Sequence, residues 1–141
     1  MKILFAADGS PQSLSALETL VKSFVYFRDP PSVTLLSVHP PVPYKAAAAA
    51  MGHDVIQRYY DEENDAALAG ARDLLKARGI AFEAERRVGS PSEEIVKFAE
   101  EGKFGMIAMG THGHTALANL VMGSVATGVV ARSKVPVLLL K

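Results

Sequence analysis

Cysteine is absent from the chain, and neither sign of charge is in excess. The absence of cysteine excludes disulfides, thiol catalysis and metal sites built on thiolates. Fifteen basic residues balance fifteen acidic ones, so no overall field steers the chain onto nucleic acid or an anionic membrane. We therefore expect neither nucleic acid nor a membrane as a partner.

Long apolar runs are missing as well. Asp8 interrupts the apolar run at the N-terminus, which leaves that run too short for the core of a signal peptide. No stretch approaches the roughly 20 apolar residues of a membrane-spanning helix. We expect a cytoplasmic protein, and the length of 141 residues predicts a single domain over 1–141.

Short apolar runs alternate with segments of helical periodicity. The apolar runs predict strands at 2–7, 32–39, 80–88, 104–110 and 135–140. Apolar residues at helical spacing predict helices at 11–27, at 54–78, after Ser90 and at roughly 115–133. Because strands and helices alternate, we predict an α/β fold, a doubly wound parallel sheet of five strands with helices on both faces.

Capping signals mark the ends of several predicted helices. Ser10 suits an N-cap, and Pro11 suits the first helical position after it. The sequence "SPSE" at 90–93 predicts a capping box with proline inside it. Gly79 is expected to end the long helix that precedes the third strand.

Unusual residues follow two of the predicted strands. Asp8 follows the first, the loop 110–113 follows the fourth, and Gly123-Ser124 precedes the last helix. Ligands of doubly wound sheets bind beyond the carboxyl ends of the strands. Glycine loops and helix N-termini expose N–H groups that suit phosphate, whereas a carboxylate suits a ribose diol. The pattern indicates a nucleotide, although spacing alone leaves open that the glycines only serve turns and packing.

The spacing Gly110-x2-Gly113-x9-Gly123-Ser124 resembles the ATP-binding signature of the universal stress protein family. The likeness extends to "KILFAADGS" at the start, to "VGSPSEEIVKFAEE" and to "MGTHGHTALANLVMGSVATGVVARSKVPVLLL". It therefore covers nearly the whole chain. The resemblance implies the strand order 3-2-1-4-5, which makes the first and fourth strands neighbours, with ATP bound between them.

The same resemblance implies a role for individual residues. Asp8 would meet the ribose, and the main chain at Val38 would meet adenine. Gly110 would flank the ribose, while Gly113, Gly123 and Ser124 would hold the phosphates. The full ATP-binding set that it implies is Ala7, Asp8, Val38, Met109, Gly110, Gly113, His114, Gly123, Ser124 and Val125.

His114 departs from the family pattern, in which arginine often occupies this position. Histidine titrates near neutral pH, so we expect phosphate binding to be weaker than with a permanent cation, or dependent on pH. His112 and His114 make a poor metal site without a nearby carboxylate or cysteine, and we expect no metal held by protein groups alone. ATP, with or without Mg²⁺, is the expected cofactor.

Two functions remain open. The first is an ATP-binding regulatory module of the stress response, whose shape or dimer surface changes with nucleotide and is read by a protein partner. The second is a slow ATPase, which needs a group that positions water, and His112 or His114 could be that group. Since no carboxylate is evident near the phosphate end, we expect binding, with at most weak hydrolysis.

The apolar segment 135–140 is expected to pair two subunits. The implied strand order leaves this segment at an edge of the sheet, and Pro136 suits an edge because it cannot donate to a ladder. An uncovered apolar edge is usually paired or shielded in natural proteins. We therefore predict a homodimer through this strand, as the family resemblance also implies.

Overall fold

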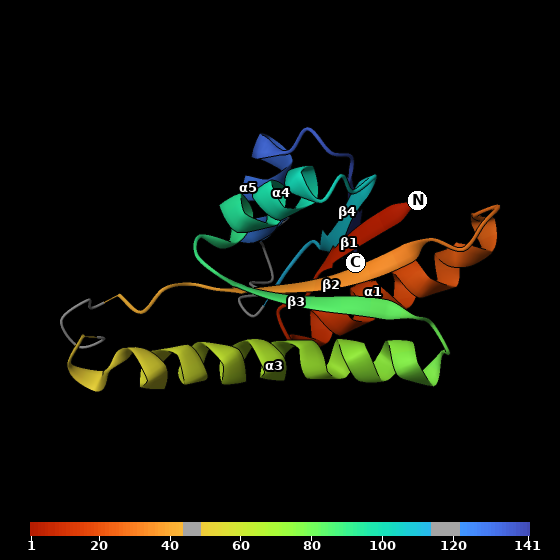
Figure 1. Cartoon of the computed structure of the whole chain (residues 1–141). Helices are drawn as coiled ribbons and strands as arrows, with labels where there is room; N and C mark the ends of the chain where they lie inside the picture. Colours follow the sequence, from red (N-terminus) through yellow and green to blue (C-terminus); the bar gives the residue numbers. More distant parts are fainter. Residues whose placement is uncertain (44–48, 114–121) are drawn as a thin grey trace.

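The protein is a five-stranded parallel sheet with helices on both faces (Figure 1). The structure is a computed structural model, which describes residues 1–43, 49–113 and 122–141. The order β3-β2-β1-β4-β5 confirms the predicted fold and strand order. The strands are β1 Lys2–Ala6, β2 Ser32–His39, β3 Phe82–Val88, β4 Met106–Gly110 and β5 Val137–Leu140.

Helices α1 (Pro11–Ser23) and α3 (His53–Ala77) cover one face of the sheet, and α4 (Pro91–Glu101) and α5 (Ser124–Arg132) cover the other (Figure 1). Successive side chains of a strand point to opposite faces of the sheet. Alternate residues of each strand therefore belong to two separate buried clusters, one on each face. Ile3 and Phe5 pack beneath α1 and α3, whereas Leu4 packs with α4 and α5. The core therefore forms two layers, one on each face of the sheet.

The first turns of α1 and α4 show which of the predicted capping hydrogen bonds form. Ser10 caps α1, and its Oγ accepts a hydrogen bond from the Ser13 N–H at 3.0 Å, which confirms the prediction. Ser90 occupies the N-cap position of α4, but its side chain makes no capping bond. The start of α4 was thus predicted correctly, whereas the capping box was wrong, because spacing fixes the position of a residue but not its rotamer.

Two predicted helices differ from the structure at their ends. The helix expected over 11–27 ends as an α-helix at Ser23 and continues as a 3₁₀ turn, η1, over Phe24–Tyr26. Of the helix expected at 115–133, the structure shows α5 from Ser124, while residues 114–121 lie outside the described part. Among the described residues, no helix is both long enough and apolar enough to cross a membrane.

Gly9 fixes the distance between the end of β1 and helix α3. Its φ is +78°, in the left-handed region, and a Cβ built on it would lie 2.9 Å from the Cα of Ala67. Both observations require glycine, because a side chain there is strained and also presses on a helix backbone. The contact makes α3 one wall of the space beyond β1.

Gly9→Ala is expected to destabilise the fold by about 2–5 kcal/mol, since backbone strain and overpacking act together. Gly79→Ala is the matched control. Gly79 also has a positive φ, +66°, but a Cβ there meets nothing within 4 Å, so only strain of about 1–2 kcal/mol is expected. Urea denaturation of both variants measures the difference, and equal losses would contradict a role for the contact with Ala67.

Candidate functional site

A pocket of about 580 Å³ opens at the carboxyl ends of the strands. The loops after β1 and β4, the start of α5 and one side of α3 surround it. All the predicted site residues that the structure describes line this pocket: Ala7, Asp8, Val38, Met109, Gly110, Gly113, Gly123, Ser124 and Val125. His114, also predicted, lies outside the described residues.

The main chain of Val38 faces this pocket. Successive residues of a strand direct their N–H and C=O groups alternately to the two neighbouring strands. The Leu36 carbonyl accepts from the Ala7 N–H at 2.9 Å, so Leu36 faces β1, and Val38 faces the same way. The register of β1 with β2 ends at Ala6 and Leu36. Val38 therefore presents a donor and an acceptor to the gap beyond β1.

β4 contributes main chain from the opposite side of the gap. Ile107 and Thr111 donate their N–H groups to Pro136 and Leu140, toward β5. By the same alternation, Gly110 faces β1, and its carbonyl lies beyond the last register pair of β1 with β4. The gap is thus flanked by backbone of β2 and of β4, as expected where the winding of a sheet reverses.

Asp8 lies at the floor of the pocket, next to Gly113. The Asp8 Oδ1 accepts a hydrogen bond from the Ser10 N–H at 2.8 Å, which fixes the carboxylate relative to the start of α1. A Cβ built on Gly113 would overlap the Asp8 Oδ2. Glycine at 113 therefore allows the carboxylate to lie in this position, and any side chain there would displace it.

The N-terminus of α5 opens onto the pocket. Gly123 is its N-cap and provides no side-chain cap, and Ser124 and Val125 begin the helix. The first N–H groups of a helix lack partners within it, and together with the helix dipole they favour an anion. The Gly123 N–H donates to the Thr111 carbonyl at 2.6 Å, which holds the helix start against the loop after β4.

The segment from the end of α4 to the start of α5 carries little permanent positive charge near the pocket. From Phe104 to Ser124 the sequence contains neither lysine nor arginine. Among the described lining residues, the carboxylates are Asp8 and Glu63 and the histidines are His39 and His112. Within the described ranges, no group of three or more acidic or histidine side chains could hold a metal. Any phosphate charge here must be met by backbone dipoles, histidine or a counter-ion.

The sequence did not reveal the α3 side of the pocket. Asn64 lines it and is only 2% exposed. One signal was available, because Asn64 falls on the buried face of α3 that also carries Leu68, Ala71 and Leu75. A polar residue in a core stripe must find partners, and those of Asn64 lie on strands distant in sequence. The other lining residues not predicted include Ser37, His39, Glu63, Ala66 and Ala67.

Fold and pocket together define a doubly wound α/β protein with a ligand pocket at its topological switch point. The sequence profile of the universal stress protein family matches residues 1–141. Universal stress protein MJ0531 of Methanocaldococcus jannaschii is 32% identical over 140 residues, which cover 99% of this chain and 81% of that protein. The chain belongs to the universal stress protein family, which confirms the resemblance seen in the sequence.

Solved structures agree with this assignment. The structure of MJ0577, also from Methanocaldococcus jannaschii, has a TM-score of 0.80 and 29% identity and covers 99% of this chain and 94% of its own. A universal stress protein in complex with cAMP has a TM-score of 0.70 and 26% identity, over 100% and 97% of the two chains. An adenine nucleotide is therefore bound by a relative of this fold.

Proposed function

We propose that the protein binds ATP in the pocket beyond β1 and acts as a nucleotide-dependent regulatory module. The observation that carries the proposal is the Val38 main chain, which offers an N–H and a C=O to the gap at the switch point. Adenine presents the complementary pair, the N1 acceptor and the N6 donor. The cAMP complex of a relative supports an adenine nucleotide.

The other groups of the pocket suit the rest of the nucleotide. The Asp8 carboxylate would accept hydrogen bonds from the ribose hydroxyls, and the start of α5 would receive phosphate. Because the segment 104–124 contains no lysine or arginine, we propose that Mg²⁺ accompanies the triphosphate and offsets its charge. Chelation of Mg²⁺ is then expected to weaken the binding of ATP.

We propose binding rather than turnover as the main activity. Hydrolysis requires a group that positions water near the γ-phosphate. Of the two carboxylates among the described lining residues, Asp8 accepts from the Ser10 N–H at the ribose end. Glu63 belongs to the α3 wall. A single-turnover assay with radiolabelled ATP separates a binding module from a slow ATPase.

Thr111 offers a route by which the bound nucleotide could be sensed elsewhere. Its carbonyl accepts from the Gly123 N–H at the start of α5, and its N–H donates to the Leu140 carbonyl at 2.9 Å. One residue thus joins the proposed phosphate site to β5, the edge of the sheet. We propose that occupancy of the site is read at this edge.

We further propose a homodimer formed by β5 of two subunits. The opposite edge, β3, carries charges at Glu83, Glu85, Arg86 and Arg87, which protect an edge strand from pairing. β5 is apolar throughout, with the sequence "VLLL". Of the two sheet edges, β5 is therefore the one suited to pairing, and a twofold axis would make that pairing antiparallel.

ATP is expected to bind at least about thirtyfold more tightly than GTP. Guanine reverses the donor and acceptor pattern at both positions that face Val38, and each main-chain group left unpaired costs about 1–3 kcal/mol. Isothermal titration with each nucleotide, in the presence of Mg²⁺, measures the ratio. Equal affinities would contradict base recognition by Val38.

A further inference from the structure

Asn64 connects three elements at the α3 wall of the pocket. Its Oδ1 accepts a hydrogen bond from the buried Ser37 hydroxyl at 2.8 Å. Its Nδ2 donates to the carbonyl of Arg87 at 3.2 Å. One side chain of α3 therefore binds both β2 and β3 near their carboxyl ends, where the pocket begins.

The two hydrogen bonds of Asn64 hold the residues next to Val38, one on β2 and one on β3. Ser37 precedes it, so the peptide unit that carries the Val38 N–H begins at Ser37. Arg87 is the register partner of Val38 on β3. Val38 itself faces β1, and it is His39 that faces β3, where its carbonyl accepts from the Gly89 N–H at 3.0 Å. Asn64 thus joins β2 at Ser37 to β3 at Arg87, next to a residue of β2 that is not itself directed toward β3.

We propose that Asn64 is a positioning residue that determines base selectivity. By holding Ser37 and Arg87 together, it keeps the Val38 N–H and C=O in the one orientation that complements adenine. Preorganised groups discriminate between ligands, whereas groups that can rotate adapt to either pattern. Without the hydrogen bonds of Asn64, backbone pairing still joins β2 to β3, but the end of β2 can shift enough for the Val38 groups to accommodate guanine. This inference rests on the proposed function, and it adds the residue that enforces the choice of base.

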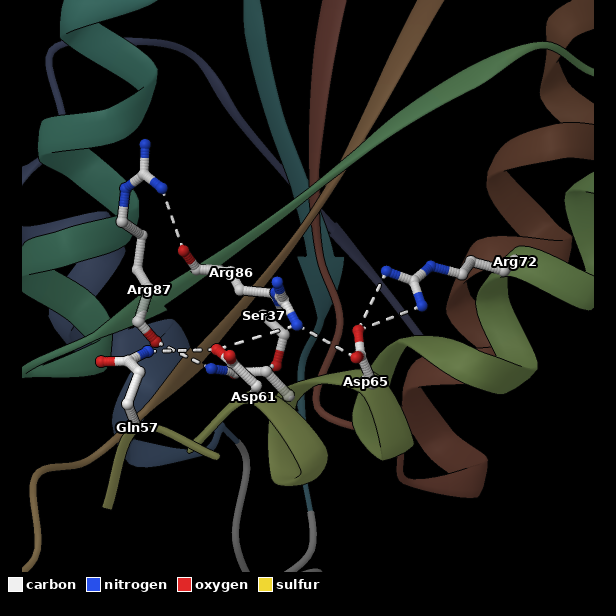
Figure 2. A network of polar contacts seen from close by, with 8 residues as sticks. Ser37, Gln57, Asp61, Asp65, Arg72, Arg86 and Arg87 are labelled. Atoms are coloured by element: carbon white, nitrogen blue, oxygen red, sulfur yellow. Dashed lines mark hydrogen bonds and ion pairs between the residues drawn. The ribbon is translucent and has the colours of Figure 1, made fainter. Parts of the chain in front are cut away.

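Partly exposed ion pairs also join α3 to β3, through Arg86 with Asp61 and Asp65, and a further pair lies within α3 (Figure 2). The Arg86 Nη1 lies 3.0 Å from the Asp65 Oδ2 and 3.7 Å from Asp61, and Arg72 lies 3.2 Å from Asp65. Ion pairs at such exposed positions contribute little, because solvent screens them. None of these four residues hydrogen-bonds to Ser37 or to the Arg87 carbonyl in the contacts described. Asp65, next to Asn64 in sequence, therefore provides a matched control.

The test compares ATP, GTP and inorganic tripolyphosphate as ligands of the wild type, Asn64→Leu and Asp65→Asn. In Asn64→Leu the ratio of ATP to GTP affinity is expected to fall about tenfold. Tripolyphosphate carries no base, so its affinity should change less than about twofold, since the α5 end is untouched. Asp65→Asn should keep the wild-type ratio. An unchanged ratio in Asn64→Leu, or an equal loss for ATP and tripolyphosphate, would overturn the proposal.

Ser37 provides a second pair of variants if Asn64→Leu does not fold. Ser37→Ala removes the donor to Asn64 and is expected to lower the ATP to GTP ratio, whereas Ser37→Thr keeps a hydroxyl and should preserve it. A purely structural role would instead lower the unfolding midpoint without changing the ratio, which would overturn the inference. A wild type that binds both nucleotides equally would contradict the proposed function itself. If the wild type prefers ATP to GTP and Ser37→Ala shows the same preference, the result would contradict only the role of Asn64.

Discussion

Gly113→Val is expected to abolish ATP binding while the protein remains folded. Even the first carbon of the new side chain would overlap the Asp8 Oδ2. The carboxylate would have to rotate, which breaks its bond to the Ser10 N–H and removes it from the ribose position. The remaining methyl groups would enter the space proposed for phosphate. Together these losses should weaken ATP binding by about a hundredfold or more, equivalent to ~2.7 kcal/mol.

The fold should tolerate this change, because the overlapped atom is the end of a side chain and Gly113 lies in a loop. Gly70→Val is the matched control. Gly70 is an exposed residue of α3, and a Cβ there makes only an ordinary contact of 3.7 Å with Leu14. Titration calorimetry and thermal unfolding should show normal ATP binding for the control and a normal unfolding midpoint for both. Normal binding by Gly113→Val would show that the site lies elsewhere.

Leu139→Pro is expected to convert a dimer into a 15.0 kDa monomer. Pro136 and Leu140 accept hydrogen bonds from β4, so by alternation Val137 and Leu139 direct their main chain to the open edge. Proline at 139 removes an outward N–H and places its ring where a partner strand would approach. Because the change occurs in both subunits, it should raise the dissociation constant about a hundredfold.

The side chain of Leu139 makes a charged substitution uninformative at this position. Leu139 packs against the cluster beneath α4 and α5, so glutamate there would disturb the core as well as the edge. Leu139→Ala is the better control, since it loses the same packing as proline but keeps the N–H. Sedimentation equilibrium should find Leu139→Ala dimeric and Leu139→Pro monomeric. A monomeric wild type at micromolar concentration, or a dimeric Leu139→Pro, would refute pairing through β5.

The elements, their order and the end of the sheet that carries the pocket can be predicted from the sequence alone, although not every element bound can. These features follow from local chemistry. Buried strands appear as apolar runs, and helices appear as apolar residues that recur every three or four positions. Ser10 caps α1 through a hydrogen bond from Ser13, only three residues away, and Pro11 occupies the first turn. Alternation of strands and helices then favours a parallel sheet, and its strand ends place Asp8 and Gly110 at the same edge.

The contacts that hold the walls of the pocket in place depend on tertiary packing and could not be predicted from the sequence. Asn64 meets Ser37 and Arg87 across separations of 27 and 23 residues, and Gly9 meets Ala67 across a separation more than twice as long. No periodicity encodes such pairs, because they depend on how far α3 lies from the sheet and on its rotation about its axis. The Val38 main chain is likewise open to the pocket only because β1 ends before β2 does. Every residue except proline carries the same backbone donor and acceptor, so their availability to a ligand depends on how the sheet packs and not on the residue type.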